Sequence, residues 1–93
     1  MHEMGIASSI LDAVQKELTR YPGYRAAKVQ VRIGELAGVD CDSLQFCFDA
    51  IVKDSSFAPL ELGIDACEGD ELDLSSIEMD DTKMDDTKQE ALV

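Results

Sequence analysis

The sequence lacks any long apolar run. Hydrophobic residues make up 45% of the chain, yet no stretch approaches the roughly 20 consecutive apolar residues that a membrane-spanning helix needs. The sequence also lacks the basic start and apolar centre of a secretory signal, since it opens with Met1, His2 and Glu3. These two absences predict a cytoplasmic protein without a membrane partner.

Basic residues are scarce. The chain has 8 Lys and Arg against 20 Asp and Glu, which gives a net charge of −12. Most of the excess acid lies in residues 61–93, where the only basic side chains are Lys83 and Lys88. This balance argues against nucleic acid as a partner and favours cations or a basic protein surface.

Cysteine and histidine are too few and too dispersed for a zinc site. Cys41, Cys47 and Cys67 contain no Cys-x-x-Cys pair, and an odd number without a secretory signal is typical of reduced thiols. On a shared helix, Cys41 and Cys47 would lie about 240° apart. We therefore expect no zinc and interpret the cysteines as small apolar side chains.

The sequence also lacks the usual signs of catalysis. It has one histidine, no nucleophile with a neighbouring base, and no Gly-rich phosphate loop after a strand. Glu35 lies in a turn bracketed by Gly34 and Gly38, where acid/base residues sometimes occur. Because no other catalytic residue is predicted near it, we expect Glu35 to cap backbone groups or to contact another protein. We therefore expect that the protein is not an enzyme.

A first amphipathic helix is predicted over residues 4–20, where apolar residues recur at three- and four-residue steps. Pro22 disfavours helical geometry at the preceding residue, so residues 21–25 should form the exit loop.

A second helix is predicted to begin after Asp40, a good N-cap residue, and to end near residues 54–56. Phe46 and Cys47 widen its apolar stripe. This width predicts burial on more than one side.

Three strands are predicted from period-two alternation. The first covers residues 28–33, and two more, at 60–66 and 72–74, are separated by a short Gly-containing segment typical of a β-hairpin. The alternation changes parity after residue 74, which predicts a bulge or break at Ser75 and Ser76.

The order helix, strand, helix, hairpin predicts an α/β two-layer sandwich, with two helices packed on a three-stranded mixed sheet. We assign residues 1–79 to this domain. Residues 79–83 are repeated as residues 84–88, and their acidic, apolar-poor composition predicts a disordered tail over residues 80–93.

The first residues of the chain have the chemistry of a metal chelate. An α-amine at Met1, the amide nitrogen of His2 and the His2 imidazole can close fused five- and six-membered rings around one ion. Nitrogen donors in one plane suit Ni(II) or Cu(II). A terminal histidine taken alone is more often solvated and unused.

Several stretches in order resemble the HypA/HybF family of nickel metallochaperones. They are the start Met-His-Glu-Met, the segments 33–40 and 46–48, the segment 60–62, and the segment 69–78. The resemblance implies Ni(II) binding through the His2 side chain and the backbone nitrogens of His2 and Glu3. It also implies that the Glu3 side chain affects selectivity and partner contact.

The same resemblance implies delivery of nickel for [NiFe]-hydrogenase maturation, with a HypB-type GTPase and the hydrogenase large subunit precursor as partners. The family inserts a zinc-binding segment with two Cys-x-x-Cys pairs where this chain has only residues 67–70. The alternative is a metal-free protein-interaction module that retains the family surface. The target, hydrogenase or urease, is left open by the sequence.

Overall fold

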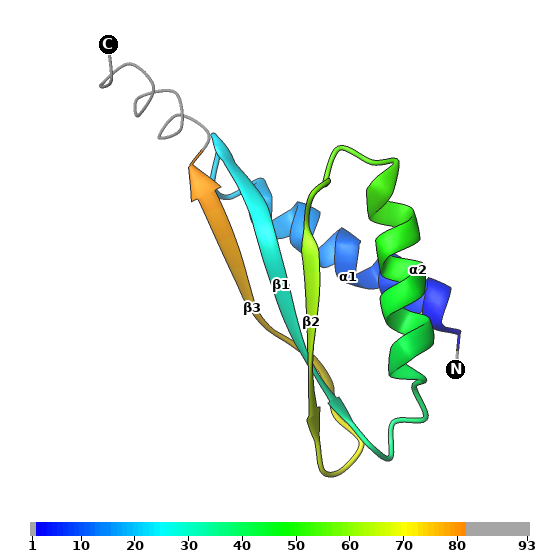
Figure 1. Cartoon of the computed structure of the whole chain (residues 1–93). Helices are drawn as coiled ribbons and strands as arrows, with labels where there is room; N and C mark the ends of the chain where they lie inside the picture. Colours follow the sequence, from blue (N-terminus) through cyan, green and yellow to red (C-terminus); the bar gives the residue numbers. More distant parts are fainter. Residues whose placement is uncertain (1, 82–93) are drawn as a thin grey trace, which may run out of the picture.

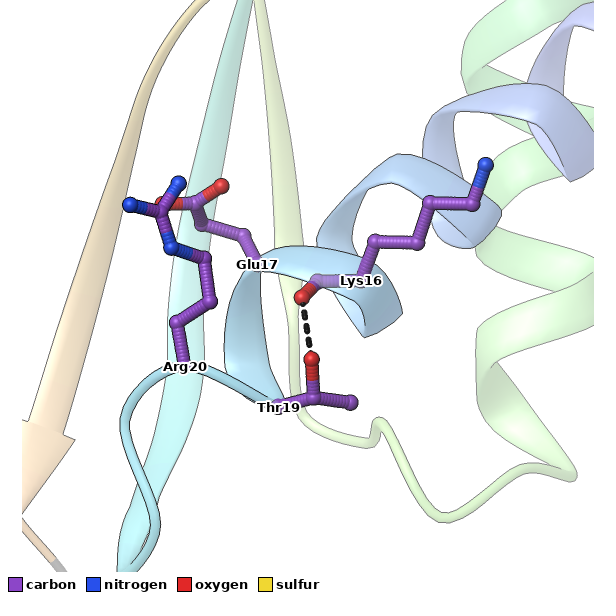
Figure 2. A network of polar contacts seen from close by, with 4 residues as sticks. All are labelled: Lys16, Glu17, Thr19 and Arg20. Atoms are coloured by element: carbon purple, nitrogen blue, oxygen red, sulfur yellow. Dashed lines mark hydrogen bonds and ion pairs between the residues drawn. The ribbon is translucent and has the colours of Figure 1, made fainter.

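The first helix, α1 (Glu3–Leu18), forms where apolar residues recur along one face. Its buried residues are Ala7, Ile10, Leu11 and Val14, which confirms the first predicted helix. The structure, a computed structural model, describes residues 2–81. The helix ends two residues earlier than predicted. Beyond Leu18, the amides of Arg20 and Tyr21 donate three residues back instead of four, and the Thr19 hydroxyl donates to the Lys16 carbonyl at 2.6 Å (Figure 2).

The second helix, α2 (Cys41–Lys53), begins at the predicted cap. The Asp40 carboxylate accepts a hydrogen bond from the Ser43 amide at 3.1 Å. Leu44, Phe48 and Val52 are buried. The prediction of burial on more than one side is wrong at Phe46, which is 74% exposed, because it lies about 200° around the helix from both Leu44 and Phe48.

The three strands form one mixed sheet in which β1 (Tyr24–Gly34) is central. β2 (Glu61–Cys67) pairs with β1 in parallel, and β3 (Leu72–Asp81) pairs with its other edge in antiparallel orientation. Figure 1 shows β1 between the two other strands, with α1 passing behind the sheet. The sheet is therefore organised around a strand that is hydrogen-bonded on both sides.

The two C-terminal strands do not form the predicted hairpin. They run antiparallel to each other but lie on opposite edges of β1, so residues 68–71 must pass across its end. Three backbone amides there donate to the crossing segment: Gly34 to Glu71 at 2.7 Å, Glu35 to Cys67 at 2.9 Å and Leu36 to Gly69 at 2.7 Å. β1 thus lies between β2 and β3, so these two strands cannot pair with each other as a hairpin.

A β-bulge in β3 confirms the predicted change of parity. Val31 pairs with Leu74 and Gln30 pairs with Ser76, so Ser75 is the extra residue. A second irregularity, which the sequence did not predict, leaves Ala27 of β1 without a counterpart. Together the two irregularities keep the apolar residues of both strands on the helix side of the sheet.

Both helices cover this apolar face. α1 packs on β1, α2 packs on β2, and the helices pack on each other. The core between the layers includes Val29, Val31 and Ile33 of β1 together with buried residues of both helices. The predicted α/β two-layer sandwich, with two helices on a three-stranded mixed sheet, is confirmed.

The opposite face of the sheet is polar. There Arg32 forms an ion pair with Glu71 at 3.3 Å. Neither helix described in residues 2–81 is long and apolar enough to cross a membrane. The tail predicted from residue 80 starts within β3, which ends at Asp81, and its remainder lies outside the described residues.

The crossing at Gly34 generates a prediction about stability. A Cβ on Gly34 would overlap the carbonyl oxygen of Gly69 and approach the Glu71 amide nitrogen at 2.7 Å. Both obstacles are backbone atoms and have little room to move. Gly34→Ala should therefore lower the free energy of unfolding by about 1–3 kcal/mol, measured by urea denaturation.

Gly5→Ala is the matched control. A Cβ at Gly5 would meet only the His2 Cβ, at 4.0 Å, and alanine raises helix propensity by about 1 kcal/mol. This variant should be as stable as the wild type or more so. Equal stability of Gly34→Ala and the wild type would contradict the tight crossing.

Candidate metal centre

His2 is the N-cap residue of α1. Its backbone is extended, with φ −90° and ψ 102°, and its carbonyl oxygen accepts the Ile6 amide at 3.1 Å. The imidazole makes no capping hydrogen bond, and the residue is exposed. The side chain is therefore not used to hold the helix, while the predicted donor Met1 lies outside the described residues.

The backbone amides at this end of α1 are also outside the helical ladder. The first four N–H groups of a helix have no acceptor within it, and here these include the amides of His2 and Glu3. A metal that displaces an amide proton at His2 would break no intrahelical hydrogen bond. The deprotonated amide nitrogen carries negative charge, which the positive end of the helix dipole stabilises.

Glu3 links the starts of the two helices. Its carboxylate oxygen Oε2 accepts a hydrogen bond from the Asp40 amide at 3.0 Å. Hydrogen bonds from the amides of Asp40 and of Glu3 itself hold the pKa of the Glu3 carboxyl below its ordinary value. The Glu3 side chain therefore ties the start of α1, which carries His2, to the start of α2.

Asp40 is the residue that sequence reasoning missed at this site. The sequence identified it only as a helix cap, a role that the structure confirms. Its contact with Glu3 joins residues 37 positions apart, and no periodicity or motif marks such a pair. The contact brings a second carboxylate to the end of the molecule that carries His2.

Glu35, the other predicted partner residue, is exposed on the turn that follows β1. Its amide donates to the Cys67 carbonyl, so its backbone belongs to the strand crossing. The exposed carboxylate is compatible with partner contact, which stays a prediction.

Side chains alone do not build a metal site in residues 2–81, where no group of three or more His, Cys, Asp or Glu side chains converges. Cys41, Cys47 and Cys67 are free thiols of intermediate burial, and the first two pack against the core. A metal held at His2 would therefore depend on backbone nitrogens, as the chelate chemistry predicts.

Comparison with known proteins identifies relatives over most of the chain. The family described as "Hydrogenase/urease nickel incorporation, metallochaperone, hypA" matches residues 1–70. The match ends before most of the C-terminal segment 69–78 that carried part of the resemblance.

Two curated relatives are named hydrogenase maturation factor HypA. The protein from Pelodictyon phaeoclathratiforme is 42% identical over 69 residues, which cover 74% of this chain and 59% of the relative. The protein from Chlorobaculum parvum is 38% identical over 68 residues, which cover 73% and 60%. The chain thus spans about three fifths of the length of these relatives.

The fold also matches a solved structure. The solution structure of the Ni metallochaperone HypA from Helicobacter pylori aligns with a TM-score of 0.57 at 17% identity, covering 86% of this chain and 92% of that one. At this identity the likeness shows a shared fold.

The Glu3–Asp40 contact generates a pH prediction. Because the folded-state pKa of Glu3 is lowered, its contribution to stability is complete above the ordinary glutamate pKa, about 4.3, and is lost as the pH falls through the folded-state pKa. Wild type should melt at a higher temperature than Glu3→Gln near neutral pH, and this difference should shrink on acidification.

Thermal melts followed by circular dichroism across this pH range measure the difference. Glu35→Gln is the control, because it removes an exposed carboxylate from a neighbouring turn and should change the melting temperature little. A Glu3→Gln difference that grew on acidification would show that Glu3 is not held in its charged form.

Proposed function

This chain belongs to the HypA family of hydrogenase/urease nickel-incorporation metallochaperones, and from that premise we propose that it binds Ni(II) at its N-terminus and delivers the ion for [NiFe]-hydrogenase maturation. The observation that carries the proposal is the state of His2. It is exposed at the start of α1, and its imidazole makes no helix-capping bond.

The proposed ligands are nitrogen atoms of the first residues. The Met1 amine, the His2 amide nitrogen and the His2 imidazole occupy three corners of a square, closing one five-membered and one six-membered ring. The Glu3 amide nitrogen is an alternative to the amine, because it cannot lie cis to the His2 amide in the same plane while the amine is bound. Planar nitrogen coordination of this kind favours Ni(II) and Cu(II).

The fourth corner needs a donor from elsewhere in the protein or from a partner. Asp40 is the candidate within the chain, since its amide is held by the Glu3 carboxylate at 3.0 Å. One Asp40 oxygen, Oδ1, accepts from Ser43, and a carboxylate has further acceptor positions. A water molecule or a side chain of the receiving protein could also supply the fourth ligand.

Nickel is cargo in this proposal, so we assign no catalytic residue and propose that the protein is not an enzyme. The proposed partners are a HypB-type GTPase and the hydrogenase large subunit precursor, met in the cytoplasm. Glu3 and Glu35 are the proposed contact residues. We propose no zinc, since Cys41, Cys47 and Cys67 are free and do not converge with other ligands in the described chain.

The alternative is a protein-interaction module without metal. It is favoured by an apolar cavity beside His2, which is lined in part by Gly5, Ile6 and Leu74. Nickel titration separates the two functions.

Replacing the imidazole should weaken nickel binding. His2→Ala removes a side-chain ligand and should weaken Ni(II) affinity by at least about tenfold, the lower end of the range found when even outer-shell partners are removed. Isothermal titration calorimetry on protein with an unmodified N-terminus measures the change. Glu35→Gln is the control and should bind as the wild type does.

Two further outcomes decide between the ligand sets. An extension of a few residues before Met1 should weaken binding if the α-amine is a ligand, and should leave it unchanged if the Glu3 amide replaces it. Equal nickel affinity of wild type and His2→Ala would exclude the proposed nickel site at the N-terminus and favour the interaction module. Because bound donors release protons, affinity should fall as the pH is lowered.

Asp40→Asn tests the fourth donor. Asparagine caps helices as well as aspartate does and keeps the backbone amide that Glu3 binds, so the fold should be retained. If the carboxylate ligates nickel, affinity should fall about tenfold, while thermal stability stays near that of the wild type. Unchanged affinity would assign the fourth position to water or to a partner.

A further inference from the structure

An open groove runs along the molecule between α1 and β3. It consists of two adjoining cavities of about 560 and 630 Å³, which share Ala13 and Leu74 in their linings. One end of this α1–β3 groove is at His2, and the other is at Tyr21 and Tyr24. The two cavities therefore meet at Ala13 and Leu74, and the smaller one is lined at its end by His2, the proposed nickel ligand.

The β3 wall of the groove is apolar because of the bulge at Ser75. The shifted register places Leu72, Leu74 and Ile77 opposite the buried residues Ile33, Val31 and Val29 of β1, on the helix side of the sheet. Yet Leu72 is 39% exposed and Leu74 is 38% exposed, because α1 lies over β1 and α2 over β2. The helix layer leaves this edge of the sheet uncovered.

The α1 wall contains a row of three small residues, beside Ile6, Ile10 and Glu17. Gly5, Ser9 and Ala13 follow at four-residue spacing and line the groove, so they lie one above another on one face of the helix. Gly5 has no positive φ, and a Cβ there would meet no atom nearer than 4.0 Å. Glycine costs a helix about 1 kcal/mol relative to alanine, and the contacts of the described chain do not require it.

A row of small side chains with an i, i+4 spacing is a shallow channel into which the side-chain ridge of another helix fits. A docked helix lying beside α1 would also cover Leu72 and Leu74, and would complete the helix layer over β3. The groove thus matches an amphipathic helix in shape and in apolar character.

The charge of the groove is acidic. The formally charged residues that line its described part are Glu17 and Asp73, and no Lys or Arg is among the lining residues. Arg20 approaches Glu17 only at 3.8 Å, and both side chains are substantially exposed, so this pair, at the end of α1 in Figure 2, is weak. With a net charge of −12, a second copy of the chain would be repelled.

We propose that the α1–β3 groove docks an amphipathic α-helix of another protein, one with an apolar face and with Lys or Arg flanking that face. The segment from Leu72 to Met79 spans about 23 Å, which corresponds to a helix of about 15 residues. Docking of the helix does not depend on nickel binding. Its role in nickel transfer does rest on the proposed function, because the docked helix would lie beside His2.

The test uses the full chain labelled with ¹⁵N and a synthetic helical peptide of about 15 residues, with leucine on one face and lysine on the other. Titration without metal, followed by amide chemical shifts, should perturb Gly5, Ser9, Ala13 and Leu74. Because nickel is absent, failure of this test and failure of nickel binding are read separately.

The neighbouring serines provide matched variants. Ser9 lines the groove, whereas Ser8 is exposed outside it. Ser9→Gln should fill the channel and weaken peptide binding by about tenfold or more, the loss expected when a central contact is blocked. Ser8→Gln makes the same chemical change one position away and should leave binding unchanged.

Three results would overturn the proposal. A peptide of the same composition in scrambled order that binds equally well would reduce the interaction to general charge attraction. A concentration-dependent dimer that Ser9→Gln dissociates would make a second copy the occupant. Deletion of residues 82–93 that by itself shifts the groove signals would assign the groove to the chain's own C-terminal segment.

Discussion

The hydrogen-bond ladders on both edges of β1 hold the fold together. β1 pairs with β2 on one side and with β3 on the other, so its pleat decides which side chains of all three strands face the helices. The irregularities at Ala27 and Ser75 matter for this reason, because without them the apolar residues of β1 and β3 would change face along their length. The buried layer and the exposed groove both follow from this shared register.

The N-terminal site depends on a second and much smaller constraint. Glu3 holds the Asp40 amide, while Asp40 caps α2 through Ser43. The starts of both helices are therefore tied together at one point. Helix ends fray, and this contact restrains the end that carries His2. The His2 imidazole takes no part in this contact and makes no helix-capping hydrogen bond.

Local chemistry accounts for what the sequence predicted correctly. The helix periods, the Asp40 cap and the parity change near Ser75 each depend on a few neighbouring residues. They could therefore be predicted without knowing which other segments pack nearby. The hairpin was not, because alternation identifies strands and says nothing about which strand lies next to which. The place of β1 between β2 and β3 depends on a crossing at Gly34, where residues far apart in sequence meet.

The candidate site divides in the same way. His2 was identified from chelate chemistry and from the matching downstream stretches, both of which are linear features of the chain. The Glu3–Asp40 contact joins two helices, and the exposure of Phe46 depends on which side of α2 meets the core. Neither can be obtained from periodicity alone, since both are set by how the finished layers are oriented.

The strand crossing at residues 68–71 has a consequence for how such a protein can be built. Two of the three hydrogen bonds at the crossing, from Gly34 to Glu71 and from Glu35 to Cys67, lie at the ends of β3 and β2 and do not involve the middle of the joining segment. The entropy needed to close a loop grows only slowly with its length. A longer segment can therefore be inserted between β2 and β3 at a small entropic cost, while these hydrogen bonds and the pairing of the sheet are kept.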